Sequence, residues 1–572
     1  MIGGGVAGMS AAHELARRGG FDVVVYEQRA VAGGKARSMD AIPGTDGRRA
    51  LPGEHGFRFF PGFYRHLPDT MTRIPYAGQL RGVFDNLVAA TQVQIAREGS
   101  QNELVAPAHF PDSPSDWHAV LRFALEFATG VGIPVDEQIA FVGVISDLLS
   151  ACEERRFGQY ENQSWWEFSG AEQRSPAYQK FLADGLTRSL VAARAREMSA
   201  RTGGSILLQL LQDLARPGGQ ADRVLNGPTS DVWIDPWVEE VGRLGVELRF
   251  GQAVEAIESE DGRVTGISGH AVDEAGNVGA AFADSADHYI AAIPVEVLRE
   301  RIAMDDLKHH CPALAGLDAL QVRWMNGIMF YLQRDVPLVH GHSIFIDSPW
   351  ALTSISQRQF WPHFNPHDMG DGSVGGILSV DVSDWDTPGA HAALGKIAKT
   401  CSKETIAAEV WDQLKAALND GTEVLADANR LAWFLDPDII TPNPTEATNL
   451  EPLLVNTKGS WPHRPAAELP EVDNLFLASD YVQTYSDLAT MEGANEAARR
   501  AVNAILEASG SDAEPCEVWK LDEPGGLLFA LARQADRLLY KLRGPGHRPP
   551  PTVALKDGKL ETNPISRMTG LG

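Results

Sequence analysis

The first ten residues, "MIGGGVAGMS" (residues 1–10), contain the pattern that decides the fold. Gly3, Gly5 and Gly8 are spaced as Gly-x-Gly-x-x-Gly, and a stretch with helical periodicity follows. "FDVVVYE" then reads as a buried strand that ends at Glu27. A glycine-rich turn, a helix and a strand that ends on an acidic residue predict the βαβ unit that binds a dinucleotide. The alternative is a βαβ unit without a ligand.

Each part of this unit has a role in dinucleotide binding. The first glycine makes a tight turn, the second lets the backbone approach a pyrophosphate, and the third lets helix and strand pack closely. The start of the helix faces the phosphates, and the acidic residue accepts hydrogen bonds from ribose hydroxyls, which disfavours a 2′-phosphate. The expected cofactor contacts are Gly3, Gly5, Val6, Ala7, Gly8 and Glu27.

Very little sequence precedes this loop. Only Met1 and Ile2 stand before Gly3, whereas such a loop normally follows a buried central strand. Burial of each missing Val or Ile would contribute roughly 1.5–3 kcal/mol. We therefore expect the natural chain to begin upstream, with several more apolar residues.

The composition is that of a globular protein with a large core. The chain has 572 residues, of which 44% are hydrophobic and 22% charged. It has no run of 18 apolar residues and no signal-peptide pattern, so we expect no transmembrane helix. The formal net charge of −26 argues against general nucleic-acid binding. Four widely spaced cysteines without a Cys-x-x-Cys pair fit a reducing, cytoplasmic compartment, and we expect no metal site.

A second glycine pair follows the acidic residue. In "QRAVAGGKARS" (residues 28–38), two adjacent glycines and two cations make a second loop for close approach to a long dinucleotide. This spacing resembles the flavin amine oxidase and phytoene desaturase superfamily, in which Gly-Gly-Arg/Lys follows the Glu by six residues. The resemblance implies FAD, with contacts from Gly33, Gly34, Lys35 and Arg37.

Four later stretches continue the resemblance. "LPGEHGFRFFPGFYRHL" (residues 51–67) is similar to the segment that passes the flavin in plant-type phytoene and zeta-carotene desaturases, although Arg58 replaces a His and Pro61 is inserted. Residues 197–214 and 223–267 resemble zeta-carotene desaturases, and residues 474–506 resemble the closing FAD motif of the superfamily. The further cofactor contacts that the resemblance implies are Gly56, Phe57, Val254, Ala292, Asp480, Thr490, Met491, Glu492 and Ala494.

The resemblance implies an α/β fold: a Rossmann-like FAD-binding domain (GR2-type flavoprotein) with an antiparallel-sheet substrate domain and a helical cap. We expect a discontinuous FAD-binding domain in residues 1–85, 215–300 and 455–510. Residues 86–214 have helical periodicity and form the expected cap, and residues 301–454 form the expected substrate-binding sheet.

The implied activity is that of an FAD-dependent oxidoreductase, a desaturase or dehydrogenase. It would take a hydride from a lipophilic isoprenoid, carotenoid-like or fatty acyl substrate and leave a C=C bond, with a quinone or oxygen as electron acceptor. His55, Arg58 and Tyr481 are the polar residues expected near the ring as catalytic groups. Three alternatives stay open: a hydroxysqualene dehydroxylase-like enzyme, a flavin amine oxidase, and a non-catalytic flavoprotein subunit.

The tail over residues 511–572 lies outside the resemblance. An amphipathic helix is expected at about residues 524–543, and residues 533–548 carry five Lys/Arg against one acid, Asp536. This helix either lies on an anionic membrane surface, as in a peripheral membrane protein, or docks on the protein itself or on a partner subunit.

Overall fold

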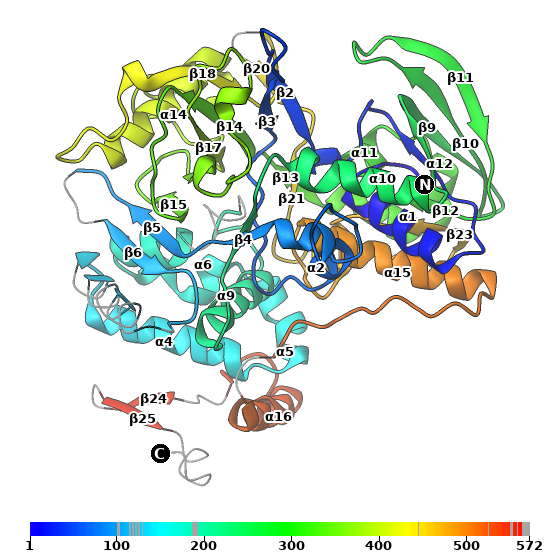
Figure 1. Cartoon of the computed structure of the whole chain (residues 1–572). Coiled ribbons are helices and arrows are strands. Elements are labelled where there is room, and N and C mark those ends of the chain that lie inside the picture. Colours follow the sequence, from blue (N-terminus) through cyan, green and yellow to red (C-terminus); the bar gives the residue numbers. More distant parts are fainter. Residues whose placement is uncertain are drawn as a thin grey trace.

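The computed structural model has two sheets with helices packed around them (Figure 1). The structure describes residues 1–99, 103–111, 113, 116, 119–120, 123, 126–127, 130–185, 193–443, 446–523, 526–549, 553–556 and 559–562. The range 86–214, to which the sequence assigns a helical cap, lies partly outside these residues, as does the end of the tail.

A mainly parallel sheet is built around the first residues of the chain. Ile2 forms parallel bridges to Tyr26 on one side and to Ala291 on the other. The backbone N–H groups of Gly3 and Ala292 donate to the carbonyl oxygens of Tyr26 and Ile2, each over 2.8 Å. The strand that the glycine loop requires is thus present as residues 1–3, in the middle of the sheet. The order across it is β8 (Glu247–Phe250), β1 (Val24–Glu27), residues 1–3, β12 (Tyr289–Ala291), β23 (Val472–Leu477) and β22 (Glu468–Leu469).

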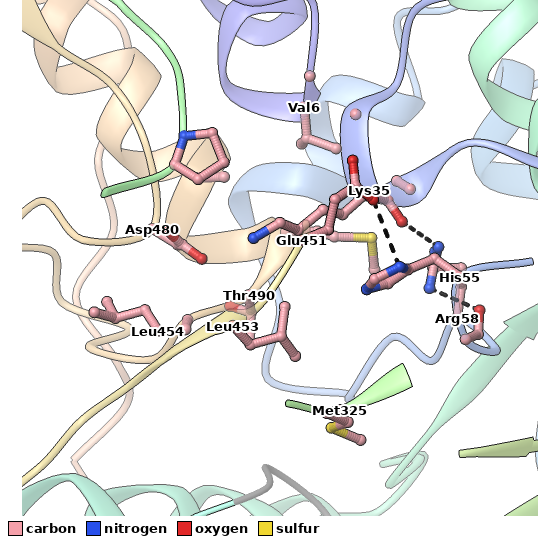
Figure 2. A pocket seen from close by; sticks show the side chains of 18 of the residues that line it. Val6, Lys35, His55, Arg58, Met325, Glu451, Leu453, Leu454, Asp480 and Thr490 are labelled. Atoms are coloured by element: carbon pink, nitrogen blue, oxygen red, sulfur yellow. Dashed lines mark hydrogen bonds and ion pairs between the residues drawn. The ribbon is translucent and has the colours of Figure 1, made fainter. Parts of the chain in front are cut away.

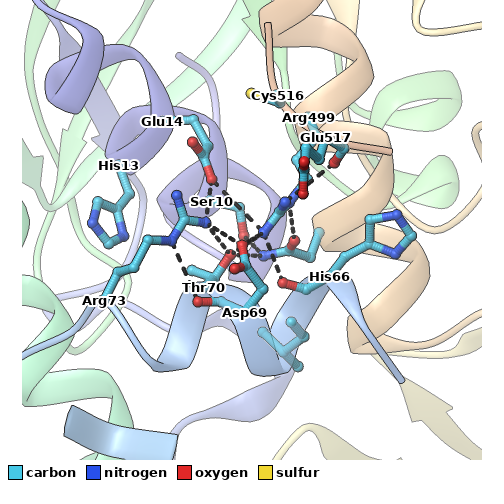
Figure 3. A network of polar contacts seen from close by, with 12 residues as sticks. Ser10, His13, Glu14, His66, Asp69, Thr70, Arg73, Arg499, Cys516 and Glu517 are labelled. Carbon is cyan, nitrogen blue, oxygen red and sulfur yellow. Dashed lines mark hydrogen bonds and ion pairs between the residues drawn. The ribbon is translucent and has the colours of Figure 1, made fainter. Parts of the chain in front are cut away.

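Helix α1 (Val6–Arg18) follows the glycine loop and packs against α15 (Met491–Ser509), from the other end of the chain. A polar network joins these helices to the short helix α2 (His66–Met71) (Figure 3). Within it, the Arg499 guanidinium lies 2.5 Å from the Asp69 carboxylate, and the Arg73 guanidinium lies 2.5 Å from that of Glu14. The network fixes the position of α1 at the sheet.

The second sheet has seven strands and an apolar face covered by α14 (Lys403–Leu418). Its outer two strands, β5 and β6, come from the range 86–214, to which the sequence assigns a helical cap. β5 pairs in parallel with β15, and this long-range pairing leaves no local trace in the sequence. The order is β18 (Arg430–Leu435), β14 (Asn326–Leu332), β17 (Gly376–Val382), β16 (Leu352–Ser356), β15 (Gly341–Phe345), β5 (Gln92–Ala96) and β6 (Leu104–Pro107).

Smaller antiparallel units lie beside the two sheets. They are the pairs β2 (Ser38–Ile42) with β3 (Leu51–Glu54), β4 (Leu87–Ala89) with β7 (Arg223–Leu225), β13 (Gln321–Arg323) with β21 (Leu453–Val455) and β19 (Ile439–Asn443) with β20 (Glu446–Asn449), and the unit β9 (Gln252–Glu260), β10 (Arg263–Val272), β11 (Val278–Asp284).

Helices dominate the region below the second sheet in Figure 1. The main ones are α4 (Val135–Ser150), α5 (Glu153–Gly158), α6 (Trp165–Ser169) and α9 (Ala200–Ala215), while α10 (Asp235–Arg243), α11 (Val295–Glu300), α12 (Asp305–His310) and α13 (Pro312–Gly316) lie by the first sheet. In the tail, α16 (Gly526–Arg543) packs on α4 and α5, and a hairpin of β24 (Val553–Lys556) and β25 (Lys559–Thr562) follows. In the part of the chain that the structure describes, no helix combines the length and apolar character needed to cross a membrane.

Candidate functional site

A cavity of about 870 Å³ lies where the two sheets meet, and it is lined by residues of both (Figure 2). Most residues that the sequence predicts at the cofactor line it, although they come from distant parts of the chain. Those at the cavity wall are Gly3, Gly5, Val6, Ala7, Glu27, Gly33, Gly34, Lys35, Gly56, Phe57, Val254, Ala292, Asp480, Thr490, Met491 and Ala494.

Two glycine loops meet at one end of the cavity. Gly3 and Gly33 have φ values of 101° and 104°, which favour glycine strongly. The Gly33 N–H donates to the carbonyl of Gly4 over 2.8 Å, and a Cβ on Gly34 would lie 3.1 Å from Cα of Gly5. Side chains at these positions would separate the loops and fill the cavity, so the glycines keep two stretches of backbone close to any ligand.

The N-terminus of α1 opens on the same end. Val6 and Ala7 line the cavity, and no side chain among the described residues caps the first turn of α1. Free N–H groups and the positive end of the helix dipole make such a terminus an anion site. This arrangement fits the diphosphate of a dinucleotide.

Glu27 is buried beside the loops, and its carboxylate is already partly used. It accepts from the backbone N–H groups of Gly4, over 2.8 Å, and Arg29, over 2.9 Å. Burial raises the pKa of Glu27, and these two hydrogen bonds oppose the rise. A carboxylate has about four lone-pair sites, so acceptor capacity remains for ribose hydroxyls.

Three predicted contacts do not line the cavity. A Cβ on Gly8 would lie 1.9 Å from the carbonyl oxygen of Gly3, so this glycine allows α1 to pack on the loop. Arg37 donates to the Gly34 carbonyl over 2.7 Å and pairs with Asp438 over 2.8 Å. Glu492 turns to α2, where its carboxylate accepts from the backbone of Arg65, His66 and Leu67. All three residues contact segments that line the cavity but do not line it themselves.

Of the three residues expected to be catalytic, some line the cavity and one does not. His55 and Arg58 line the cavity, whereas Tyr481 does not and is fully buried. Burial raises the pKa of the Tyr481 hydroxyl, which is without a hydrogen-bond partner among the described residues. Nδ1 of His55 lies 2.5 Å from the carboxylate of Asp436. Arg58 donates to the Gly56 carbonyl over 2.7 Å, which aims its guanidinium along the loop.

Asp381 is a cavity residue that the sequence did not indicate. It lies on β17, and a Cβ on Gly56 would come within 2.6 Å of its Oδ1. Burial raises the pKa of Asp381 to about 7, although the charges of Arg58 and His55 oppose the rise. A strand position without a motif gives no local signal for this carboxyl group.

Asp222 and His342 form a second polar pair at the cavity wall that sequence reasoning missed. Nδ1 of His342 lies 3.1 Å from Oδ2 of Asp222. The imidazole packs between Phe57 and Phe59, with ring centroids 5.1 and 5.4 Å away. Nε2 of His342 is buried without a hydrogen-bond partner among the described residues. A carboxylate on one ring nitrogen leaves the other free to exchange a proton with a ligand.

An apolar wall completes the cavity. Three residues on one face of α9, Ile206, Leu210 and Leu214, line it opposite strand residues such as Val93 and Ile344. Their spacing places them on a single helix face. Figure 2 shows Met325, Leu453 and Leu454 in the same cavity. This wall offers carbon surface and no hydrogen-bonding side chain.

Nothing in the described residues forms a cluster of three or more His, Cys, Asp or Glu side chains suited to a metal ion. All four cysteines are free thiols in the structure, and each is buried.

Comparison with known proteins identifies the family. The model of the flavin containing amine oxidoreductase family matches residues 6–506. Among curated proteins, none matches the chain. The FAD-binding α/β fold expected from the sequence is confirmed, while the desaturase branch is not resolved by these matches.

Solved structures of low identity share the fold. Cyclohexylamine oxidase from Brevibacterium oxydans IH-35A is 15% identical with a TM-score of 0.54, and 89% of this chain covers 98% of that one. Putrescine oxidase with bound putrescine is 13% identical with a TM-score of 0.55, over 88% and 98% of the chains. An oxidoreductase from Methanosarcina mazei is 14% identical with a TM-score of 0.52, over 88% and 99%. The chain belongs to the flavin-containing amine oxidoreductase family and is an FAD-dependent oxidoreductase.

Proposed function

We propose that this flavoenzyme dehydrogenates a carbon chain of a lipophilic substrate, isoprenoid, carotenoid-like or fatty acyl, and leaves a C=C bond. The apolar wall formed by Ile206, Leu210 and Leu214 of α9 carries the proposal. An extended hydrocarbon binds by burying apolar surface, at about 25 cal/mol per Å². The resemblance of residues 51–67, 197–214 and 223–267 to desaturases supports the same substrate class.

Desaturation removes a hydride from one carbon and a proton from its neighbour. Bound FAD supplies the hydride acceptor, and the protein must take the proton. Nε2 of His342 is a suitable acceptor, because it is unpartnered among the described residues and lies at the cavity wall. Asp222 would hold the ring and stabilise the imidazolium that forms. A quinone or oxygen would then take the two electrons.

Oxidation of an amine is the second candidate. Asp222 and Asp381 are buried carboxyl groups at the cavity wall, and either is a potential partner for an ammonium group. The solved cyclohexylamine and putrescine oxidases give this candidate its precedent for the fold. Against it, each carboxyl group already has a neighbour in the protein, the His342 ring for Asp222 and the charge of Arg58 for Asp381. In a site that binds an ammonium group, we expect the carboxylates to face the ligand without a protein side chain already beside them.

Anaerobic reduction of the bound flavin separates the candidates. Purified yellow protein is mixed with a polyisoprenoid or fatty acyl lipid in detergent, and separately with cyclohexylamine and putrescine. We expect loss of the oxidised flavin band with a lipid and no loss with the amines. Bleaching by amines alone would refute the proposal, and a yellow protein that neither lipids nor amines bleach would favour the non-catalytic flavoprotein subunit.

A further inference from the structure

The tail helix α16 docks through its polar side. The carboxylate of Asp536 lies 2.8 Å from Nη2 of Arg155 on α5, and both side chains are 0% exposed. The same carboxylate accepts from the backbone N–H of Cys152 over 2.9 Å. Ala532 is buried on the same side, and Leu539 and Tyr540 are half-buried, so this side of α16 faces the protein.

Further contacts fix the same orientation. The Arg155 guanidinium stacks on the Tyr540 ring, 4.9 Å from its centroid, and donates to the carbonyl of His547 over 2.6 Å. Arg537 pairs with Glu154 over 2.8 Å at the margin of the contact. A buried ion pair adds little stability over apolar packing, because both charges lose their hydration. It does specify one orientation, since rotation of the helix would leave a buried charge without a partner.

The opposite side of α16 is a leucine face, defined by Leu527, Leu531, Leu538 and Leu542. Their exposed fractions are 74%, 38%, 64% and 81%. Spacings of four, seven and four residues place them on one side of the helix, away from Asp536. Four adjacent exposed leucines are unusual for a surface that meets only water.

α4, the helix on which α16 packs, also has exposed apolar residues. Val135 and Val142 of α4 are 69% and 47% exposed, and seven residues apart they share a face. α16 contacts the other end of α4, where Arg533 donates to the carbonyl of Leu149 over 3.0 Å. The two valines lie nearer the start of α4.

The charges at this surface indicate its partner. Lys541 and Arg543 are exposed at the end of α16 and Arg548 is exposed beyond it; Lys541 lies 3.9 Å from Glu154, and Arg548 lies 3.6 Å from Asp147. Residues 533–548 carry five basic side chains and one acidic one, in a chain of formal net charge −26. Leucines flanked by cations complement the acyl and headgroup layers of an anionic bilayer. A second copy of this acidic chain would bring negative charge instead.

We propose that the leucine face of α16 binds the surface of an anionic membrane, with the helix lying in its plane.

The position of the leucine face also suits the entry of substrate into the cavity, a step that rests on the proposed function. α16 packs on α4, and α4 packs on α9, whose inner face lines the cavity while Leu211 is 42% exposed on its outer side. A lipid could pass from the bilayer to the cavity along these helices.

Co-sedimentation of the full chain with vesicles tests the proposal. Vesicles of phosphatidylcholine with phosphatidylglycerol are compared with phosphatidylcholine alone, at low and high salt. We expect binding to the anionic vesicles, weakened by salt, and a loss of partitioning of about tenfold or more in the double variant L538S/L542S. K541Q/R543Q should weaken binding to anionic vesicles only.

Leu80→Ser is the matched control, because Leu80 is 100% exposed but lies outside this surface. It should leave vesicle binding unchanged, and all variants should keep the flavin spectrum and thermal midpoint of the parent. Equal pelleting of L538S/L542S and the parent would overturn the proposal. Failure of the parent protein to pellet with either kind of vesicle would also overturn it. If sedimentation velocity then finds a dimer that L538S/L542S abolishes, the leucine face is an interface between two copies of the chain. None of these readouts depends on turnover, so they stand apart from the test of the proposed function.

Discussion

Nδ1 of His342 lies 3.1 Å from Oδ2 of Asp222, and both side chains line the cavity of an FAD-dependent oxidoreductase. His342 belongs to strand β15 of the second sheet, whereas Asp222 precedes β7, which pairs with β4. The pair therefore forms only when the two regions of the fold are assembled. Its place opposite the apolar wall makes it the first target for mutation.

Replacement of His342 by Gln should slow flavin reduction by the substrate by about 10²–10⁴-fold, because proton removal loses its acceptor. FAD content should not change. His340→Gln is the control, since His340 is a neighbour that does not line the cavity. Stopped-flow reduction under anaerobic conditions gives the rates. A variant that reduces at the parental rate would exclude His342 as the proton acceptor.

Asp222→Asn tests whether the carboxylate acts through the imidazole. The substitution removes the carboxylate that lies 3.1 Å from Nδ1 of His342, so a proton on the ring loses its partner. The maximum rate should fall, because the asparagine no longer stabilises the imidazolium. The double variant D222N/H342Q should be no slower than H342Q, and a further loss of rate in it would show that Asp222 does not act through the imidazole.

Two glycines of the opening loop should respond differently to substitution. A Cβ on Gly8 meets the Gly3 carbonyl oxygen at 1.9 Å, so Gly8→Ala should destabilise flavin-free protein by about 1–3 kcal/mol. The atom nearest to a Cβ on Gly5 is Cα of Gly34, at 3.8 Å. Gly5→Val should therefore project into the cavity and lower mainly the FAD content of the protein. Urea unfolding and flavin content measure the two effects. Equal effects of both substitutions would contradict this division.

Asp381 should make stability depend on pH. Its pKa is raised to about 7 by burial, above the usual 3.8, so between these values the folded chain holds a proton that the unfolded chain has lost. Stability should therefore fall as pH rises through this window, by up to roughly 1.4 kcal/mol per unit. Asp381→Asn should remove that contribution. Denaturation curves of both proteins at pH 5 and 7 give the difference, which would be zero if Asp381 titrated normally.

Glu492 should contribute more to the stability of the region around α2 than to the affinity for FAD. Its carboxylate accepts three backbone N–H groups at the start of α2 and lies 2.8 Å from Nδ1 of His66. Glu492→Gln turns an amide donor toward these donors and should cost about 2–3 kcal/mol of stability. The affinity of the folded variant for FAD should change little. A large loss of FAD affinity without loss of stability would place Glu492 at the cofactor instead.

The two glycine loops and Glu27 at one end of the cavity can be predicted from the sequence, because the motifs that define them are local. Glycines at fixed spacing before a helix and an acid at the end of a strand define a backbone shape. The same motifs say nothing of side-chain direction, and so Arg37 and Glu492 were expected at the cavity although they turn to Asp438 and α2. Asp381 and the Asp222–His342 pair have no local pattern at all.

The tail shows the same limit. Periodicity correctly indicates an amphipathic helix, confirmed as α16, but it cannot show which side docks. A single buried pair, Arg155 with Asp536, decides that. Likewise, strands β5 and β6 join the second sheet through pairing with β15, which a local helical reading of residues 86–214 does not anticipate.

The central position of residues 1–3 has a consequence for biosynthesis. Residues 1–3 need β12 as a neighbour, and the cavity that they help to line needs α15 as well. At about 5–20 residues per second, α15 emerges only after some tens of seconds. Until β12 emerges, residues 1–3 have a partner strand only in β1, and until α15 emerges the cavity expected to hold FAD is incomplete. Cofactor loading is therefore a late event in the life of each molecule, and a chaperone that shields the opening segment would raise the yield of holoenzyme.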